Sequence, residues 1–209
     1  MSWISDIVDA TNPSSVMDMG CGAGILLKLL KQRNNSLKLN GIDAAENLIR
    51  IGSKILQQNL IIGDYCVDSP DSEYDLIVCE FGYDNSSFPE STKPHSSARC
   101  GAIDYCPGCV EDEQDHFRKF IKAWRKWAAP NGALALTGRM TDYTAVRAVT
   151  LAAKEEGWFV DLSLSKVLTT IDKFDGRQFF PAWYFTTEES RSASNEEIAN
   201  FYAAGDVTP

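Results

Sequence analysis

The chain has 209 residues, enough to bury one substantial core, and we expect a single domain over residues 1–209. Its 44% hydrophobic and 23% charged residues are ordinary for a water-soluble globular protein, and no apolar run approaches the roughly 20 residues of a membrane span. The net charge of −9 disfavours nucleic-acid binding, because proteins of that class usually present a basic face. We interpret the one basic segment, at 118–126, as the solvated face of an amphipathic helix.

The N-terminal residues 1–15 have neither a basic start nor an apolar core with a small-residue cleavage site, so no secretory signal is predicted. We therefore expect a cytoplasmic protein whose six cysteines are thiols. In that compartment a cluster of cysteines indicates a metal site or a catalytic site rather than a disulfide framework.

Short apolar runs alternate with helical patterns in the first part of the chain, which predicts a parallel sheet covered by helices. The run at 74–81 is apolar throughout, as expected of a strand in the middle of such a sheet. We expect strands at 15–20, 37–43, 59–64 and 74–81, and helices at 23–33 and 45–56.

A segment rich in Ser, Pro, Gly, Cys and Asp, residues 82–111, interrupts this alternation, and loops of such length tend to be functional. Beyond it, Pro181 predicts an edge strand or a bulge. The tail at 188–209 holds a capping box, Ser194 with Glu197, which predicts a short terminal helix. We expect further helices at 111–129 and 141–157, and further strands at 133–138, 158–170 and 177–187. The fold class that follows is α/β, with a mostly parallel seven-stranded sheet and helices on both faces.

The stretch VMDMGCGAG, residues 16–24, lies where the first strand meets the first helix. Its glycines let a ligand approach the backbone, and the helix N-terminus offers amide donors to a carboxylate or a phosphate. Glycines at 20, 22 and 24 followed by Ile25 depart from the dinucleotide pattern G-x-G-x-x-G. The spacing therefore disfavours a dinucleotide as the ligand.

The pattern D-x-G-x-G-x-G, carried by Asp18, Gly20, Gly22 and Gly24, resembles the first motif of class I S-adenosylmethionine-dependent methyltransferases. Further motifs in the same order extend the resemblance over about residues 14–186. The resemblance implies a Rossmann-like fold, S-adenosylmethionine as cofactor, and a cofactor site that includes these four residues.

The resemblance also assigns cofactor roles at the ends of the next three strands. It implies that Asp43 holds the ribose hydroxyls, that Asp64 contacts the adenine amine with Tyr65 beside it, and that Glu80 ends the fourth-strand motif. Asp43 lies nineteen residues beyond Gly24, the spacing of a ribose-binding acid. An Asp after a strand can equally cap a helix, and this alternative stays open for both acids.

Methyl transfer requires that a nucleophile be aligned with an already activated methyl group and that water be excluded. A base would help if the nucleophile carries a proton, and Glu80 and Tyr83 lie where the fourth strand ends. Glu80 could instead be a solvated strand-end residue. Other positions at which a base or a pocket wall could lie are Phe81, Asp84, His95 and His116.

The acceptor is expected to be a small molecule. The sequence EFGY at 80–83 stands where relatives that methylate amino groups of bases or glutamine carry N-P-P-Y. Few residues precede the first motif, so we expect the 82–111 insertion to act as the substrate lid, with 139–143 and 172–180 as secondary walls.

The insertion also holds a candidate zinc site. Cys106 and Cys109 have the two-residue spacing of a zinc knuckle, and Cys100 with His95, or with His116 instead, could complete a tetrahedral set. Unliganded thiols, a disulfide and a catalytic metal are the alternatives. A redox role is disfavoured, because thioredoxin-like motifs begin a helix, whereas this one precedes acidic residues that are expected to raise a thiol pKa. The remaining cysteines, Cys21, Cys66 and Cys79, are expected to be small buried residues.

Three other functions remain open. One is methylation of a protein or an RNA, and a second is a non-catalytic methyltransferase-like module that binds a partner through the cysteine-rich loop. A NAD-dependent oxidoreductase is the third. We expect a small-molecule substrate as the partner, neither nucleic acid nor membrane, and a homodimer as one open assembly state.

Overall fold

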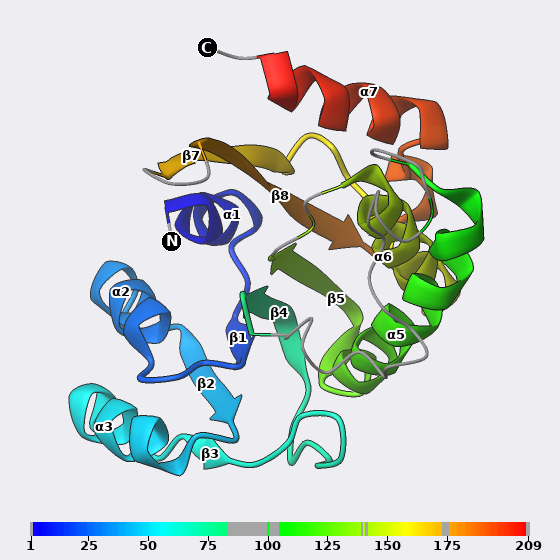
Figure 1. The fold of residues 1–209 in the computed structure, drawn as a ribbon. Coiled ribbons are helices and arrows are strands. Elements are labelled where there is room, and N and C mark those ends of the chain that lie inside the picture. Colours follow the sequence, from blue (N-terminus) through cyan, green and yellow to red (C-terminus); the bar gives the residue numbers. More distant parts are fainter. Residues whose placement is uncertain are drawn as a thin grey trace.

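The computed structural model describes residues 2–82, 100, 105–138, 140, 142–172 and 176–207. Over these residues eight strands form one sheet in the order β3-β2-β1-β4-β5-β8-β6, and β7 pairs with β8 beside this path (Figure 1). Strands β1 to β5 run parallel, whereas β8 is antiparallel to its neighbours. The strands are β1 (Ser15–Met19), β2 (Lys38–Asp43), β3 (Ile61–Ile62), β4 (Tyr74–Glu80), β5 (Ala128–Thr137), β6 (Phe159–Val160), β7 (Lys166–Asp172) and β8 (Gly176–Thr186).

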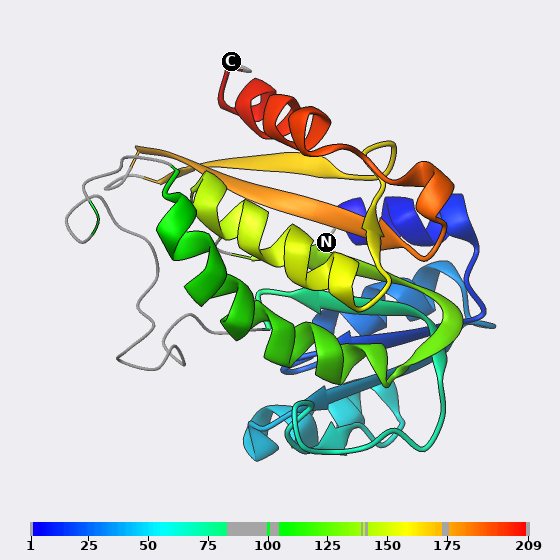
Figure 2. The same cartoon turned by 90° about the vertical axis from the view of Figure 1, so that its right-hand side faces the viewer.

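Helices cover both faces of this sheet, which confirms the predicted fold class (Figures 1 and 2). Helices α1, α2 and α3 lie on one face, and α5 and α6 lie side by side on the other. The helices are α1 (Ser2–Thr11), α2 (Ile25–Arg33), α3 (Glu46–Leu56), α5 (Pro107–Arg125), α6 (Tyr143–Glu155), the short 3-10 helix η2 (Glu189–Arg191) and α7 (Asn195–Val207).

Each face of the sheet has its own hydrophobic core. Val16 and Val78 belong to the core under α1, α2 and α3, whereas Met17 and Ile77 belong to the core under α5 and α6. Successive side chains of a strand point to opposite faces, so strands buried on both faces are apolar at every position. This explains why β1 and β4 could be located within one or two residues from their apolar runs.

Helix α5 begins at Pro107 and ends at Arg125, so the predicted bounds of 111–129 are wrong at both ends. Proline at the first helical position is favourable because its missing N–H has no partner there. At the other end, the Arg125 guanidinium donates hydrogen bonds to the carbonyls of Ala128, Ala129 and Pro130, which lie beyond the helix. The acidic run 111–115 that suggested the helix start is therefore already inside the helix.

Strand β5 begins at Ala128, five residues before the predicted start at 133. Ala128 pairs with Tyr74, and regular pairing with β4 resumes at Ala133 and Leu76 after a register shift. A Cβ on Gly132 would lie 2.8 Å from the Tyr74 carbonyl oxygen, so glycine permits this close approach. The Pro-Asn-Gly turn signal thus marks an irregularity within a strand.

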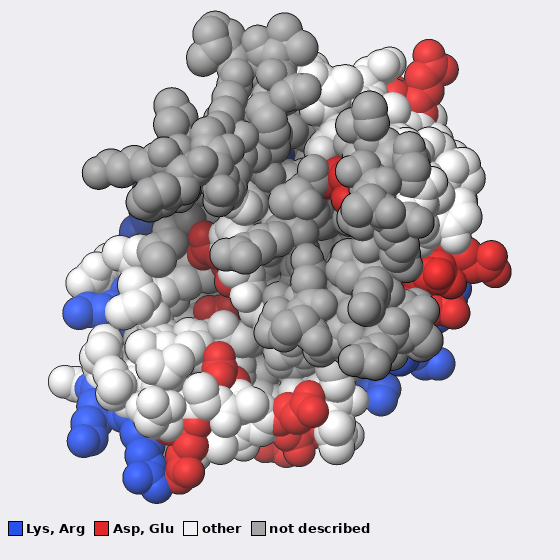
Figure 3. Space-filling view, viewed as in Figure 1, with Lys and Arg blue, Asp and Glu red and all other residues white. Residues whose placement is uncertain are grey.

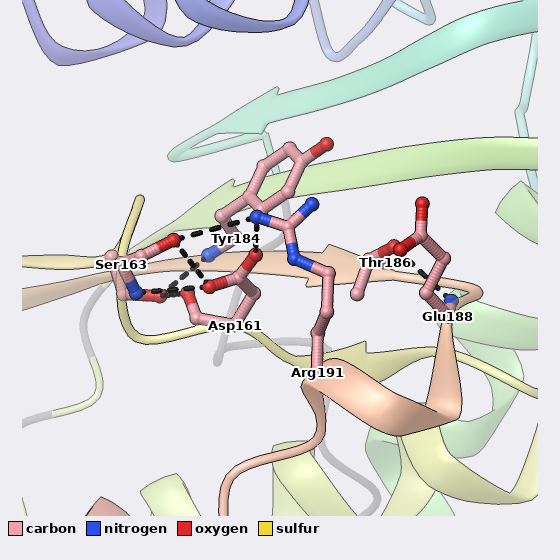
Figure 4. A network of polar contacts seen from close by, with 7 residues as sticks. Asp161, Ser163, Tyr184, Thr186, Glu188 and Arg191 are labelled. Atoms are coloured by element: carbon pink, nitrogen blue, oxygen red, sulfur yellow. Dashed lines mark hydrogen bonds and ion pairs between the residues drawn. The ribbon is translucent and has the colours of Figure 1, made fainter.

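The predicted strand 158–170 is divided into β6 and β7, which explains why the sheet has eight strands rather than seven. Both pair with the same edge of β8, and the Tyr184 N–H donates to the Ser165 hydroxyl where the two strands separate. Figure 4 shows Arg191 reaching from η2 to the buried carboxylate of Asp161, which also accepts two hydrogen bonds from Ser163. These contacts hold the chain between β6 and β7, where it does not pair with β8 as a strand.

Of the two terminal helices, α1 and α7, only α7 was predicted from the sequence. Helix α1 was not predicted, although Trp3, Ile4 and Ile7 bury one face of it, and the Trp3 indole donates to the Leu164 carbonyl. The capping box of α7 is confirmed, because the Ser194 N–H donates to Glu197 at 2.7 Å.

Pro181 lies in the part of β8 that pairs with β7 alone among the described residues, because pairing with β5 begins only at Ala182. The proline therefore has a neighbouring strand on one side, as the prediction of an edge position requires.

Candidate functional site

Three carboxylates converge where β1, β2 and β4 end. The strand register pairs Asp18 with Gly41 and with Val78. Asp43 and Glu80 each lie two residues further along, so all three side chains project from the same face of the sheet. Figure 3 shows acidic atoms inside a hollow on the side of the molecule where the parallel strands end. The structure thus brings together three of the predicted site residues.

The buried member of this carboxylate group is Asp18, whose side chain is 4% exposed. Burial raises the pKa of Asp18 to about 7, and the charges of Glu80 and Asp43 add to this rise. Near pH 7 the Asp18 carboxyl is therefore about half ionised, and a cation bound beside it would favour the ionised form.

The glycine turn takes the shape that its sequence predicts. Gly20, Gly22 and Gly24 all have positive φ angles, of 77°, 51° and 67°. A Cβ on Gly20 would lie 2.5 Å from the Cα of Gly82, so the turn packs directly against the chain that leaves β4. No side chain caps the N-terminus of α2, so its first amides stay available to a ligand.

The two acids assigned to ribose and adenine both bond locally to backbone amides. The Asp43 carboxylate accepts hydrogen bonds from Gly22 N–H at 2.8 Å and Ala45 N–H at 2.7 Å. The Asp64 carboxylate accepts one from Cys66 N–H at 2.8 Å. A carboxylate has about four acceptor positions, so both acids combine a turn-forming role with free acceptor capacity. Asp43 thereby fixes the glycine turn to the start of α3.

The chain leaving β4 is held in one unusual conformation. Phe81 has φ of 56°, a value that is costly for a bulky residue, and its N–H donates to the Thr137 carbonyl. The Tyr65 hydroxyl donates to the Gly82 carbonyl at 2.8 Å, and its ring contacts Trp124 edge-on. In this structure Tyr65 therefore positions the strand end beside the carboxylates. Burial raises the pKa of Tyr65, so its hydroxyl stays protonated and acts as a donor.

Thr137 is a candidate site residue that the sequence reasoning missed. It pairs with Glu80 across β4 and β5, so both side chains lie on the same face of the sheet. It is 1% exposed, and its hydroxyl has no hydrogen-bond partner among the residues that the structure describes. A buried hydroxyl of this kind is the signal, but it becomes visible only in the folded chain.

Several predicted residues lie outside the described part of the chain. These are Tyr83, Asp84 and His95, together with most of the expected lid at 82–111.

The cysteines of the insertion do converge. The sulfur atoms of Cys100, Cys106 and Cys109 all lie within 4.8 Å of one another. Cys106 is the N-cap of α5 and Cys109 lies in its first turn, so the motif does begin a helix and the expectation that it does not, with a raised thiol pKa, is wrong for Cys106. Hydrogen bonds from the Cys109 thiol and the Cys109 N–H lower the pKa of the Cys106 thiol.

His116, the alternative fourth ligand, lies outside this group. It follows Cys109 by seven residues on α5, which corresponds to about 10 Å of helix. It is buried and packs edge-on against the ring of Phe120. Burial lowers the pKa of His116 to about 4, and the charge of Lys119 contributes.

The other three cysteines are dispersed. Cys21 and Cys79 are buried and Cys66 is half-buried, as expected for small core residues. The Cys21 side chain packs where a Cβ on Gly41 would otherwise lie.

Comparison with known proteins identifies the fold. A family model described as a methyltransferase domain matches residues 17–93, which include the glycine turn and all three carboxylates. The NodS N-methyltransferase of Bradyrhizobium japonicum, solved with S-adenosylhomocysteine, superimposes with a TM-score of 0.57 at 15% identity, over 90% of this chain and 85% of NodS. Residues 17–93 of this chain thus match a methyltransferase domain, and the chain has the fold of the class I methyltransferases.

Another structure of this class, a TehB-like methyltransferase of Corynebacterium glutamicum, superimposes with a TM-score of 0.54 at 15% identity. It covers 88% of this chain, which covers 86% of it. At such identities the likeness shows the fold of this chain and not its acceptor.

Curated relatives act on different acceptors. The demethylmenaquinone methyltransferase of Thermotoga maritima is 29% identical over 86 residues, which make up 40% of this chain and 38% of the relative. A tRNA1(Val) (adenine(37)-N6)-methyltransferase of Glaesserella parasuis is 24% identical over 139 residues, 63% of this chain and 54% of the relative. The chain thus spans about half of these relatives or less.

The described helices include none that combines the length and apolar character needed to cross a bilayer.

A cavity of about 360 Å³ lies between α6, β6 and the start of α7. None of the glycine-turn residues lines it, so it is distinct from the candidate site at the glycine turn.

Proposed function

We propose that this chain transfers a methyl group from S-adenosylmethionine to a small-molecule acceptor. The observation that carries the proposal is the convergence of Asp18, Asp43 and Glu80 beside an uncapped helix N-terminus at a glycine turn. Such a site combines amide donors for a carboxylate with negative charge for a cation.

The residues fit the parts of the cofactor. The free amides at the start of α2 suit its carboxylate, and the remaining acceptor capacity of Asp43 suits the ribose hydroxyls. Asp64, which is exposed, would reach the adenine amine with Tyr65 beside it. When bound, S-adenosylmethionine supplies a methyl group on a positively charged sulfur.

The carboxylate group has two tasks in this proposal. Asp18 and Glu80 contribute negative charge close to the bound cation, which favours the charged sulfonium over neutral analogues. Glu80 also lies at the strand end that faces the acceptor, where it can accept a proton from the nucleophile. Thr137 pairs with Glu80 across the sheet, and in this proposal its hydroxyl would hydrogen-bond the acceptor. Tyr83 stays a prediction, because it lies outside the described residues.

The basic helix supports a small acceptor over an RNA. Arg118 pairs with Asp115 and Glu155, and Arg125 donates to backbone carbonyls while contacting the Trp158 ring. These cations are engaged within the chain, which leaves fewer for a phosphate backbone. The tRNA-modifying relatives favour RNA as the second candidate, although EFGY at 80–83 differs from the N-P-P-Y of base-methylating enzymes.

A labelling experiment tests the proposal. The purified full chain is incubated with methyl-labelled S-adenosylmethionine and separate small-molecule, RNA and protein fractions of a cell extract. We expect label in the small-molecule fraction, and its loss in the Asp43→Asn variant. Label that enters RNA or protein instead would assign the acceptor to that class. Cofactor binding with no labelled product in any fraction would favour a non-catalytic module.

The cytoplasmic location and the homodimer stay predictions from the sequence. Size-exclusion chromatography with light scattering would test the assembly state.

A further inference from the structure

We propose that Cys100, Cys106 and Cys109 together bind one zinc ion at the N-terminus of α5. Their sulfur atoms are all within 4.8 Å of one another. Zinc–thiolate bonds of about 2.3 Å in a tetrahedral site place sulfurs about 3.8 Å apart, so the group needs only a small contraction to close on a metal.

The third sulfur distinguishes this proposal from a disulfide. A disulfide between Cys106 and Cys109 would use two sulfurs and leave Cys100 beside it without a role. A zinc ion uses all three as ligands and takes a fourth ligand or a water molecule. The other described cysteines, Cys21, Cys66 and Cys79, are not part of the group, so the convergence is local.

The scaffold under the group is fixed before any metal binds. The Cys106 N–H donates to the Thr144 hydroxyl at 2.9 Å, and Thr144 is fully buried on α6. The Cys109 N–H donates to the Cys106 carbonyl at 3.0 Å, which closes the first turn of α5 around the two sulfurs. The ring of Tyr105 contacts that of Tyr143 at 5.5 Å between centroids. Cys106 and Cys109 are therefore held on a rigid helix start, as a metal site requires.

The group also has a favourable electrostatic setting. Backbone N–H groups of Gly108 and Cys109 donate hydrogen bonds to the Cys106 sulfur. These donors and the positive end of the α5 dipole favour thiolates, which are the metal-binding form of cysteine.

Zinc at this position would tie Cys100, near the end of the 82–111 insertion, to the start of α5. This goes beyond the proposed methyl transfer, because metal content is measured without turnover. Failure of the zinc site would leave the cofactor site intact, and failure of cofactor binding would leave the zinc site intact.

Elemental analysis of the purified full chain tests the proposal, with Cys66→Ser as the matched control. We expect about one zinc per chain in the wild type and in the control. Each of Cys100→Ser, Cys106→Ser and Cys109→Ser should lower the zinc content to about a tenth or less. Cobalt titration of the metal-stripped wild type checks the ligands without any variant, since thiolate ligands give intense charge-transfer absorption.

Two results would overturn the zinc site. One is a wild-type chain that takes up neither zinc nor cobalt, with a mass that shows a disulfide or six free thiols. The other is zinc that persists in all three serine variants.

Discussion

Two regions of the molecule differ in how their polar groups are held. In the cofactor half, residues 15–82, glycines and carboxylates organise the backbone, and the Asp43 carboxylate bonds directly to the glycine turn. In the acceptor half, residues 105–207, polar groups join elements far apart in the sequence, as Arg191 does with Asp161. The family model matches residues 17–93, within which most of the first region lies, and none of the second. The difference indicates that the first region is organised by contacts within a short stretch of sequence, whereas the second is organised by contacts between distant segments.

The largest effect is expected from Gly20→Ala. The new Cβ would lie 2.5 Å from the Gly82 backbone, and φ of 77° is strained for alanine. Together these costs amount to about 4 kcal/mol of unfolding free energy, measurable by urea denaturation. Gly108→Ala is the matched control, because its Cβ meets nothing within 4 Å. Equal stability of the two variants would contradict the close packing of the turn against β4.

The pH dependence of stability tests the carboxylate group. Because the pKa of Asp18 is raised to about 7, the folded chain binds more protons than the unfolded chain between about pH 4 and pH 7. The contribution of Asp18 to stability therefore falls as the pH rises through this window, by about 3 kcal/mol between pH 5 and pH 8. Denaturation of the wild type and Asp18→Asn at pH 5 and pH 8 measures this contribution. The difference in unfolding free energy between the two proteins should change by about 3 kcal/mol between the two pH values. A difference that stays constant would contradict the raised pKa of Asp18.

In the acceptor half, Arg191→Met should lower the unfolding free energy by about 2 kcal/mol, because it leaves the buried Asp161 carboxylate without its cation. Affinity for S-adenosylmethionine should not change. Arg50→Met removes an exposed helix pair with Glu46 and should cost less than about 0.5 kcal/mol. A loss of cofactor affinity in Arg191→Met would show that the two regions are coupled.

Among the test substitutions, leaving the Arg50→Met control aside, the smallest effect is expected at the α7 cap. Ser194→Ala removes the hydroxyl that accepts from Glu197 N–H at 3.2 Å, at a cost of about 1 kcal/mol. A calorimetric melting scan measures it. No change in melting temperature would mean that α7 contributes little to the stability of the fold.

The same two regions differ in how far the sequence predicted them. Strand β4 was predicted at 74–81 and observed at Tyr74–Glu80, because a strand buried on both faces is apolar at each position. The division of 158–170 into β6 and β7 depends on Ser165, Tyr184 and Asp161, which meet only in the folded chain. Local patterns therefore sufficed in the cofactor half and not in the acceptor half.

The site shows the same limit. Asp18, Asp43 and Glu80 could be predicted because the motif resemblance assigned all three, and they lie at or near the ends of parallel strands, which meet at one edge. Thr137 also ends a strand, but nothing in its sequence context distinguishes it from a core residue. The start of α5 at Pro107 was missed because the acidic run at 111–115 gave a stronger helix signal than the proline.

The most direct test of the account is a calorimetric titration of S-adenosylmethionine into the full wild-type chain, Asp43→Asn and Asp75→Asn. Asp75 is the matched control, because its carboxylate also accepts two backbone N–H bonds, from Ser14 and Ser15, at the opposite end of the sheet. We predict binding to the wild type and the control, and affinity about 100-fold weaker in Asp43→Asn. No binding to the wild type, or equal losses in both variants, would contradict the cofactor site.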